Sequence, residues 1–343
     1  MPVTVRSFAK INLGLCIGPL RPDGFHELRT VYQTIALHDV IRISVKRGDG
    51  IEIVSNDERV PRDASNTCWK IVERAMRALK TRGRVVIEIE KRLPVQGGLG
   101  GASGNAVAAL IALEKALKKR LTGQERLRIA ADVGSDIPLF LVGGTVLGVG
   151  RGEEVYPLPD LPAMPCVIAT PGIGISTPKA FADWDKIVEL RSTGQVGTPA
   201  PRRAAPAQAD KLTASHPSDR INSFSRMISA WLSGHSSGVP VKQGRGRAET
   251  LLLDLVRTGI ENDFEQVVFP QYPELREVKS VLEQAGAIYA SLSGSGSALY
   301  GLFRTKAAAE KAAARLKKRG IPAVATTTLT RRQYWGKFPV SSF

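Results

Sequence analysis

Apolar and polar residues alternate in short runs through the first part of the chain, and this period of two is typical of β-strands. The alternation predicts four strands, at Val3–Phe8, Ile11–Ile17, Val40–Val45 and Ile51–Val54. Turn-forming residues at 47–50 separate the last two of them. A β-branched run with the same alternation predicts a fifth strand at Val85–Ile89.

Helical spacing of apolar residues occurs between and after these strands. It predicts a helix over Thr67–Leu79 and another over Glu125–Val133, which Gly134 ends because glycine is the usual residue just past a helix. Between them, a glycine-rich loop at 97–104 leads into a third helical pattern. The apolar residues of that pattern fall on one face, at Val107, Leu110, Ile111 and Leu117.

The last third of the chain has a regular order of elements. In sequence, we expect a helix at 273–285, a strand at 287–292, a strand at 298–303, a helix at 305–319 and a strand at 322–328. The two adjacent strands are joined by Ser293–Ser297. With a strand near Cys166–Thr170, this order predicts a split β-α-β arrangement, in which helices cover one face of an antiparallel sheet.

Residues 191–247 differ from the rest in composition. They are rich in Pro, Ala and small polar residues, so they bury too little apolar area to offset the entropy of ordering. We expect a mobile insertion here, with one short amphipathic helix at Ser223–Leu232. The length of 343 residues favours two domains, which we place at 1–160 and, with the insertion, at 161–343.

Charge and cysteine content narrow the functional classes. The net charge of +16 favours an anionic partner: a nucleic acid, a membrane surface or a phosphorylated ligand. Much of it lies in 304–343, where Glu310 is the one acidic residue, and such a run is usually a solvated face. The three cysteines are far apart, which favours neither a disulfide framework nor a zinc site and fits the cytoplasm. The N-terminal segment lacks the order of a signal peptide, and no apolar run is long enough to cross a membrane.

The glycine loop carries the strongest chemical signal. It follows a predicted strand and opens a predicted helix, and glycine lets backbone N–H groups approach a phosphate at the positive end of the helix dipole. The loop is not a Walker A sequence, since no Lys follows the glycines, and its spacing does not fit the dinucleotide fingerprint. The alternative is a flexible turn. The expected nucleotide-binding residues are Pro94, Gly97, Gly98, Leu99, Gly100, Gly101, Ala102, Ser103 and Gly104.

These residues resemble the second motif of the GHMP kinases, a group that includes galactokinase, homoserine kinase and mevalonate kinase. Ala9–Leu13 and Leu292–Ala298 resemble the first and third motifs and stand where that family has them. The resemblance implies an α+β fold of two domains. The N-terminal one would bind ATP in a ribosomal protein S5 domain 2-like fold, and the C-terminal one would be ferredoxin-like. It also places Asn66 and Lys91 at the adenine.

The same resemblance implies a catalytic pair. The segment Gly134–Phe140 is similar to the family segment that carries the catalytic base, which makes Asp136 the base and Lys10 the cation that orients the substrate hydroxyl. Two alternatives stay open: Asp136 could cap a short helix that Pro138 begins, and Lys10 could guard an edge strand. ATP chemistry implies Mg²⁺. The sequence shows no carboxylate cage, so the triphosphate and water would hold the metal, with Ser103 nearby.

The segment Arg21–Thr30 resembles one GHMP subgroup, which phosphorylates the 2-hydroxyl of a cytidine diphosphate conjugate of methylerythritol in non-mevalonate isoprenoid synthesis. The resemblance implies that an aromatic residue and a histidine bind cytosine, with a second aromatic residue stacking on the base and an asparagine near the methylerythritol or diphosphate. In this chain these are Phe25, His26, Phe181 and Asn12. Position 25 is often Tyr in the subgroup. A turn histidine and a core phenylalanine are the structural alternatives.

Two other functions remain possible from the sequence. A different GHMP kinase, of the homoserine or mevalonate type, would share the loop but not the Arg21–Thr30 pattern. A nucleic-acid-binding protein would use the basic segments, yet residues 191–220 contain no Phe, Tyr or Trp to stack on bases. We therefore expect a kinase with a small-molecule substrate, no specific nucleic acid or membrane partner, and a monomeric or weakly dimeric state.

Overall fold

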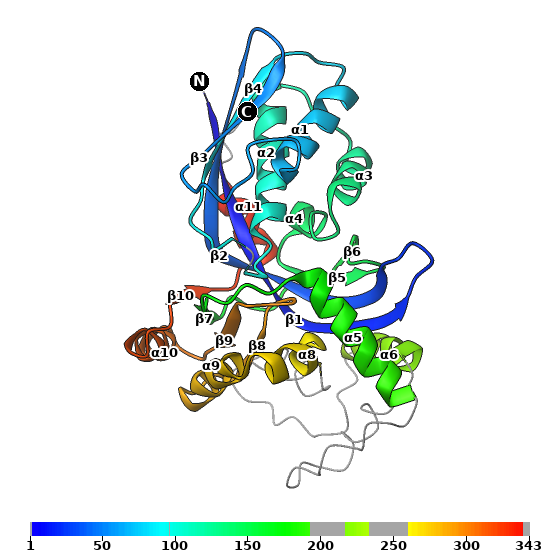
Figure 1. The fold of residues 1–343 in the computed structure, drawn as a ribbon. Coiled ribbons are helices and arrows are strands. Elements are labelled where there is room, and N and C mark those ends of the chain that lie inside the picture. The colour runs from blue at the N-terminus through cyan, green and yellow to red at the C-terminus, as the bar shows by residue number, and fades with distance from the viewer. Residues whose placement is uncertain (1, 96, 193–216, 233–259, 339–343) are drawn as a thin grey trace.

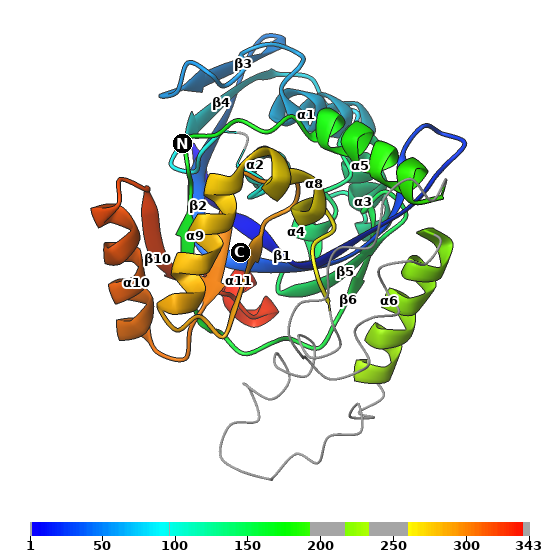
Figure 2. The ribbon, with the colours of Figure 1, turned by 60° about the horizontal axis from the view of Figure 1, so that its bottom comes forward.

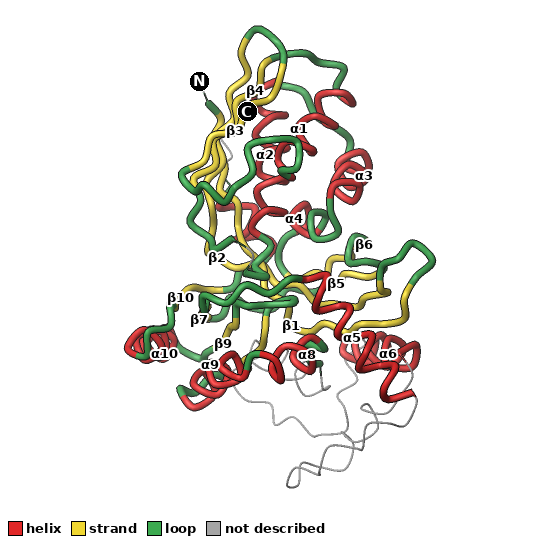
Figure 3. The backbone as a smooth tube through the Cα atoms, in the orientation of Figure 1, coloured by secondary structure: helices red, strands yellow, loops and turns green. Residues whose placement is uncertain are grey.

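The computed structural model describes residues 2–95, 97–192, 217–232 and 260–338, and in these ranges the chain forms two sheets, each covered by helices (Figures 1 and 3). The first sheet contains six strands in the order β3-β4-β2-β5-β6, with β1 paired to the free side of β2. Its strands are β1 Val3–Leu20, β2 His26–Lys46, β3 Gly50–Ser55, β4 Arg84–Glu90, β5 Thr145–Val149 and β6 Glu154–Pro157.

The long antiparallel pair β1–β2 differs from the sequence prediction. Val3–Phe8 and Ile11–Ile17 are parts of one strand, because a register shift between Phe8 and Ala9 bends the ladder without ending it. The partner strand begins at His26, well before the predicted Val40. The two strands therefore carry the first sheet from the upper into the lower half of the molecule, where β2 pairs with β5 (Figure 1).

Four helices cover one face of the first sheet: α1 Thr67–Ala78, α2 Gly101–Leu117, α3 Gly123–Val133 and α4 Leu139–Val142 (Figure 1). The central one, α2, packs against both β1 and β2 and against α1. Small and aliphatic residues on nearly every side allow this close approach. The last helix, α11 Arg331–Lys337, returns to the same core, where Tyr334 and Phe338 pack against Phe8.

The second sheet is antiparallel, with the order β10-β7-β9-β8. Its strands are β7 Pro165–Ala169, β8 Tyr289–Leu292, β9 Leu299–Leu302 and β10 Ala323–Thr327. On one face lie α8 Phe264–Gln271, α9 Pro273–Gln284 and α10 Lys306–Lys318 (Figure 2). This is the split β-α-β arrangement that the element order predicted, and the predicted α+β fold is confirmed.

Strand β1 of the first sheet also contacts the second sheet and the segment before α8. Tyr300 in β9 donates a hydrogen bond to the carbonyl of Asn12 (2.7 Å), and Tyr289 in β8 donates one to Leu13 (2.9 Å). The backbone of Leu15 pairs with Glu261 just before α8. The C-terminal half is therefore held directly against the strand that carries Lys10.

Two more helices pack on the lower part of the molecule, α5 Thr177–Ser192 and α6 Pro217–Leu232. The partly buried Arg220 in α6 forms an ion pair with the buried Asp263, and burial raises the pKa of that carboxyl to about 6, although Arg220 acts in the opposite direction. α6 begins six residues before the predicted Ser223. Most of the expected insertion at 191–247 lies outside the described residues. Within the described ranges, no helix has the length and apolar character needed to span a membrane.

Candidate active site

The glycine loop connects β4 to α2 in a conformation that requires glycine at two positions. Gly98 and Gly100 have φ values of +72° and +68°, in the left-handed region that favours residues without a Cβ. Helix α2 begins at Gly101, and its N-cap residue, Gly100, has no side chain that could cap the helix. Its first backbone N–H groups are therefore available to an anion, and the helix dipole favours negative charge there.

The third motif, at 292–298, braces this loop from the C-terminal half. Ser293 donates a hydrogen bond from its hydroxyl to the carbonyl of Gly98 (2.9 Å), and Ala298 donates one to Gly97 (3.2 Å). A Cβ on Gly98 would lie 2.1 Å from the carbonyl oxygen of Ser293, so the two backbones touch. Asn262 in turn donates to the carbonyls of Leu292 and Gly294, which fixes the motif itself.

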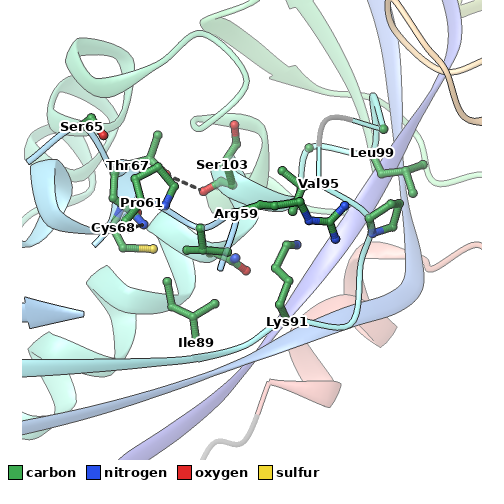
Figure 4. A pocket seen from close by; sticks show the side chains of 18 of the residues that line it. Arg59, Pro61, Ser65, Thr67, Cys68, Ile89, Lys91, Val95, Leu99 and Ser103 are labelled. Atoms are coloured by element: carbon green, nitrogen blue, oxygen red, sulfur yellow. Dashed lines mark hydrogen bonds between the residues drawn. The ribbon is translucent and has the colours of Figure 1, made fainter. Parts of the chain in front are cut away.

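A cavity of about 330 Å³ opens on one side of the loop (Figure 4). Asn66 and Lys91 line it together with Cys68, and Figure 4 shows the Lys91 side chain pointing into it. Both groups of the Asn66 amide already have partners: it caps α1 by accepting from the Cys68 N–H and donates to Pro61. Burial raises the pKa of the Cys68 thiol to about 12, so it stays protonated. The nucleotide-binding residues predicted from sequence that line this cavity are Asn66, Lys91, Pro94, Gly97, Gly98, Leu99, Gly100, Gly101, Ala102 and Ser103.

The ammonium group of Lys91 forms an ion pair with the fully buried carboxylate of Asp39. Asp39 in β2 accepts hydrogen bonds from Lys91 Nζ (2.5 Å) and from the Asn105 amide (3.0 Å) with one oxygen. Its other oxygen accepts two backbone N–H groups, from Arg92 and Leu93 (2.7 Å each). One carboxylate therefore fixes both the lysine and the start of the glycine loop. No pattern in the sequence pointed to Asp39.

A second cavity, of about 660 Å³, opens on the other side of the loop. The two cavities share three lining residues, Gly98, Gly100 and Ser103. Lys10 and Asp136 line only the second one. A phosphate chain at the loop would therefore end beside a group bound in the second cavity, with the Lys10–Asp136 pair next to it.

The structure brings the expected catalytic pair together. Lys10 Nζ lies 3.3 Å from Asp136 Oδ2 and 2.7 Å from Asn12 Oδ1, and the Lys10 side chain is only 3% exposed. An edge-strand guard would face water, so burial argues against that alternative. The side chain of Asp136 contacts Lys10 and Tyr32, and the N-cap position of α4 is Pro138.

Three polar side chains, which share one face of the β1–β2 ladder with Lys10, organise this pair. Asn12 lies directly opposite Tyr32 in the register, and Lys10 and Thr30 are each two residues away from one of them. Asn12 donates to the Thr30 hydroxyl (2.8 Å), and Tyr32 donates to Asp136 Oδ1 (2.9 Å). Both groups of the Asn12 amide are thus engaged with protein. Thr30 and Tyr32 were not identified from sequence, although the period of two along β2 could have indicated their face.

The predicted base-binding residues lie at the far end of the second cavity. His26 and Phe181 stack on each other, with ring centroids 4.9 Å apart and planes 11° from parallel. His26 also shares a 2.7 Å contact with Asp185 in α5. Phe25 is half exposed, and the Arg151 guanidinium lies over its ring at 4.9 Å. Asp185 and Arg151 had no sequence signal, because each reaches the cavity from a distant element.

Comparisons with known proteins agree with this geometry. Residues 66–144 match the family model of the GHMP kinases N terminal domain, and 247–322 match that of GHMP kinases C terminal. A protein of Solibacter usitatus, named 4-diphosphocytidyl-2-C-methyl-D-erythritol kinase, is 37% identical over 88% of this chain and 81% of its own length. One of the same name from Desulfitobacterium hafniense is 32% identical over 97% of this chain and 98% of its own.

Solved structures give the same picture. A crystal structure of 4-(cytidine 5'-diphospho)-2C-methyl-D-erythritol kinase is 27% identical, covers 95% of this chain and 98% of its own, and has a TM-score of 0.66. The homoserine kinase of Cytophaga hutchinsonii has a TM-score of 0.67 at only 20% identity, with 96% and 95% covered. The homoserine kinase likeness therefore concerns the fold, whereas the sequence relatives above 30% point to a single subgroup.

Proposed function

The chain belongs to the 4-diphosphocytidyl-2-C-methyl-D-erythritol kinase family of GHMP kinases, and from this premise we propose that it phosphorylates the 2-hydroxyl of that compound with ATP. The observation that carries the proposal is the meeting of two cavities at the glycine loop, with Lys10 and Asp136 on the acceptor side only. Donor and acceptor would then approach from opposite sides of one loop, as in-line transfer requires.

Asp136 is proposed as the base that takes the proton of the acceptor hydroxyl. Its Oδ2 faces Lys10 at 3.3 Å, longer than the 2.7–2.9 Å typical of a charge-assisted hydrogen bond, so the oxygen can accept another donor. Lys10 would hold the hydroxyl oxygen and stabilise the negative charge that develops on it. Asn12 keeps the ammonium in place through their 2.7 Å hydrogen bond.

ATP is proposed to bind in the smaller cavity, with its phosphates on the N–H groups of the glycine loop and of α2. The ammonium group of Lys91, which lines this cavity, would contact the nucleotide. No cluster of His, Cys, Asp or Glu among the described residues could hold a metal alone. The Ser103 hydroxyl offers an oxygen ligand of the kind that Mg²⁺ accepts beside phosphate and water. Such an ion would neutralise charge on the transferred phosphoryl group.

The other end of the acceptor is proposed to bind at His26, Phe25 and Phe181. The rings of Phe25 and Phe181 would stack on cytosine, and the His26 imidazole, which Asp185 contacts at 2.7 Å, would hydrogen-bond the edge of the base. The diphosphate would then lie between this end and Lys10. Among the described residues that line that cavity, Arg151 is the one lysine or arginine besides Lys10, and Glu153 accepts a hydrogen bond from its side chain. We therefore propose that Arg151 binds the diphosphate.

An ADP-release assay tests the function. At equal concentrations, the cytidine diphosphate conjugate should react far faster than homoserine, mevalonate or methylerythritol phosphate. Base stacking is worth about 1–3 kcal/mol, so Phe181→Ala should raise KM for the conjugate roughly 5- to 150-fold. Equal rates with methylerythritol phosphate would remove the cytidine site. The cytoplasmic location, the monomeric or weakly dimeric state and the place in isoprenoid synthesis remain predictions.

A further inference from the structure

One buried phenol in the acceptor cavity is not explained by binding of either substrate. Tyr32 in β2 donates a hydrogen bond to Asp136 Oδ1 (2.9 Å), while Lys10 faces the other oxygen of the same carboxylate. The two residues are 104 positions apart, and the tyrosine is only 2% exposed. The carboxylate is therefore held on two sides by groups from the adjacent strands β1 and β2.

Asp136 needs such a support because its own position leaves it free to turn. It lies in the turn before α4 and its side chain is 36% exposed. The torsion that rotates a carboxylate about its last carbon–carbon bond has a broad energy profile. Without a fixed donor, the oxygen that faces Lys10 would spend much of its time elsewhere.

The phenol is itself held rigidly by two glycines of the β5–β6 hairpin. A Cβ on Gly148 would lie 2.5 Å from Tyr32 Cε2, and one on Gly152 would lie 2.6 Å from the phenol oxygen. Gly152 has a φ of +99°, so the chain passes the phenol in a conformation that other residues rarely adopt. The backbone at both glycines is therefore packed directly against the tyrosine ring, which limits how far the phenol can move.

The phenol of Tyr32 also stays protonated. Burial raises the pKa of Tyr32 well above its usual value, and the nearby Asp136 carboxylate raises it further. The hydroxyl therefore always donates in this pair and never accepts a proton from the substrate.

From this geometry we propose that Tyr32 is a positioning residue for the base, which fixes Asp136 so that Oδ2 faces Lys10 and the acceptor hydroxyl. The inference rests on the proposed function, since it assumes that Asp136 is the base. The role is specific to catalysis: it orients the carboxylate and contributes little to substrate affinity. Removing the phenol oxygen should therefore lower kcat and leave KM alone.

The test is Tyr32→Phe, which keeps the ring and removes the hydrogen bond. A hydrogen bond to a charged group implies a fall in kcat of about 10- to 100-fold, with KM for ATP and for the cytidine diphosphate conjugate changed less than about threefold. A kcat within about twofold of the wild type would overturn the proposal, and so would a KM for the conjugate that rises as much as kcat falls.

A second variant tests the same contact from the other side. Gly152→Ala should push the phenol away and lower kcat, but in the Tyr32→Phe background the clashing oxygen is gone, so the further loss should be below about twofold. Equal losses in the two backgrounds would overturn the proposal. Gly286→Ala is the control for backbone strain, because its φ of +90° is similar and no atom of the described residues lies within 4 Å of the added Cβ. It should lower the melting temperature without changing kcat.

Measuring Asp136→Asn alongside separates this inference from the proposed function. If Asp136→Asn is active, the assignment of the base fails and the role of Tyr32 fails with it. If Asp136→Asn is inactive and Tyr32→Phe behaves as the wild type, only the positioning role of Tyr32 fails.

Discussion

The buried Asp39 carboxylate allows a quantitative prediction about the ATP side of the site. In Asp39→Asn, one of the two oxygens becomes an NH₂ group. Whichever way the amide turns, this group faces two donors: either the N–H groups of Arg92 and Leu93, or Lys91 Nζ and the Asn105 amide. The variant also leaves the Lys91 ammonium, only 7% exposed, without its counter-ion.

The size of the effect follows from these contacts. Breaking a buried ion pair by removing one partner costs about 3–5 kcal/mol, because the remaining charge stays buried. We expect Asp39→Asn to lower the free energy of unfolding by about that amount and the melting temperature by roughly 5–15 °C. KM for ATP should rise as well, because the carboxylate holds both Lys91 and the start of the glycine loop.

A second substitution should restore much of the stability. In Asp39→Asn with Lys91→Met the uncompensated charge is gone. The oxygen of the introduced amide can still accept from Arg92 and Leu93. Its NH₂ group can then donate to Asn105 Oδ1, a buried atom that has no hydrogen-bond partner among the described residues, if the Asn105 amide turns over. The double variant should be more stable than Asp39→Asn by about 2–4 kcal/mol.

Urea unfolding followed by circular dichroism measures both effects. The matched control is Asp132→Asn, which makes the same chemical change in the exposed pair with Arg128 and should cost less than about 0.5 kcal/mol. The reasoning is refuted if Asp39→Asn costs less than about 1 kcal/mol, or if Lys91→Met lowers stability further in the Asp39→Asn background.

Three further predictions concern the reaction itself. Asp136→Asn should lower kcat by about 10²–10⁴-fold and keep the affinity for ATP, and a variant that retains more than about a tenth of wild-type kcat would show that another group is the base. Arg151→Ala should raise KM for the cytidine diphosphate conjugate with little change in kcat, while Arg151→Lys recovers part of the loss; unchanged KM would place the diphosphate elsewhere. Gly98→Ala should lower both the melting temperature and kcat, because its Cβ would lie 2.1 Å from the Ser293 carbonyl; a fully active variant would mean that this brace is dispensable.

The sequence by itself determined most of the fold class and the centre of the site. Strands and helices are predicted from apolar periods of two and 3.6 residues. These periods can be read within a short stretch of sequence, without knowing which other segment packs against it. The glycine loop is equally local, since Gly98 and Gly100 adopt positive φ values in a segment that joins a strand to a helix. For these reasons the loop and the second sheet could be predicted, and the resemblance could point to Lys10 and Asp136 as a pair.

Only the tertiary structure decided which side chains support that centre. Tyr32 reaches Asp136 across 104 positions, Asp39 reaches Lys91 across 52, and Asp185 reaches His26 across 159. No spacing in the sequence records such contacts, because they depend on the register of β1 with β2 and on helices that pack from distant parts of the chain. The continuity of β1 also depends on a distant segment. The strand does not end at the register shift between Phe8 and Ala9, because β2 pairs with it on both sides of the shift. Local patterns fix the elements, whereas the burial of a charge or a phenol depends on what the fold brings against it.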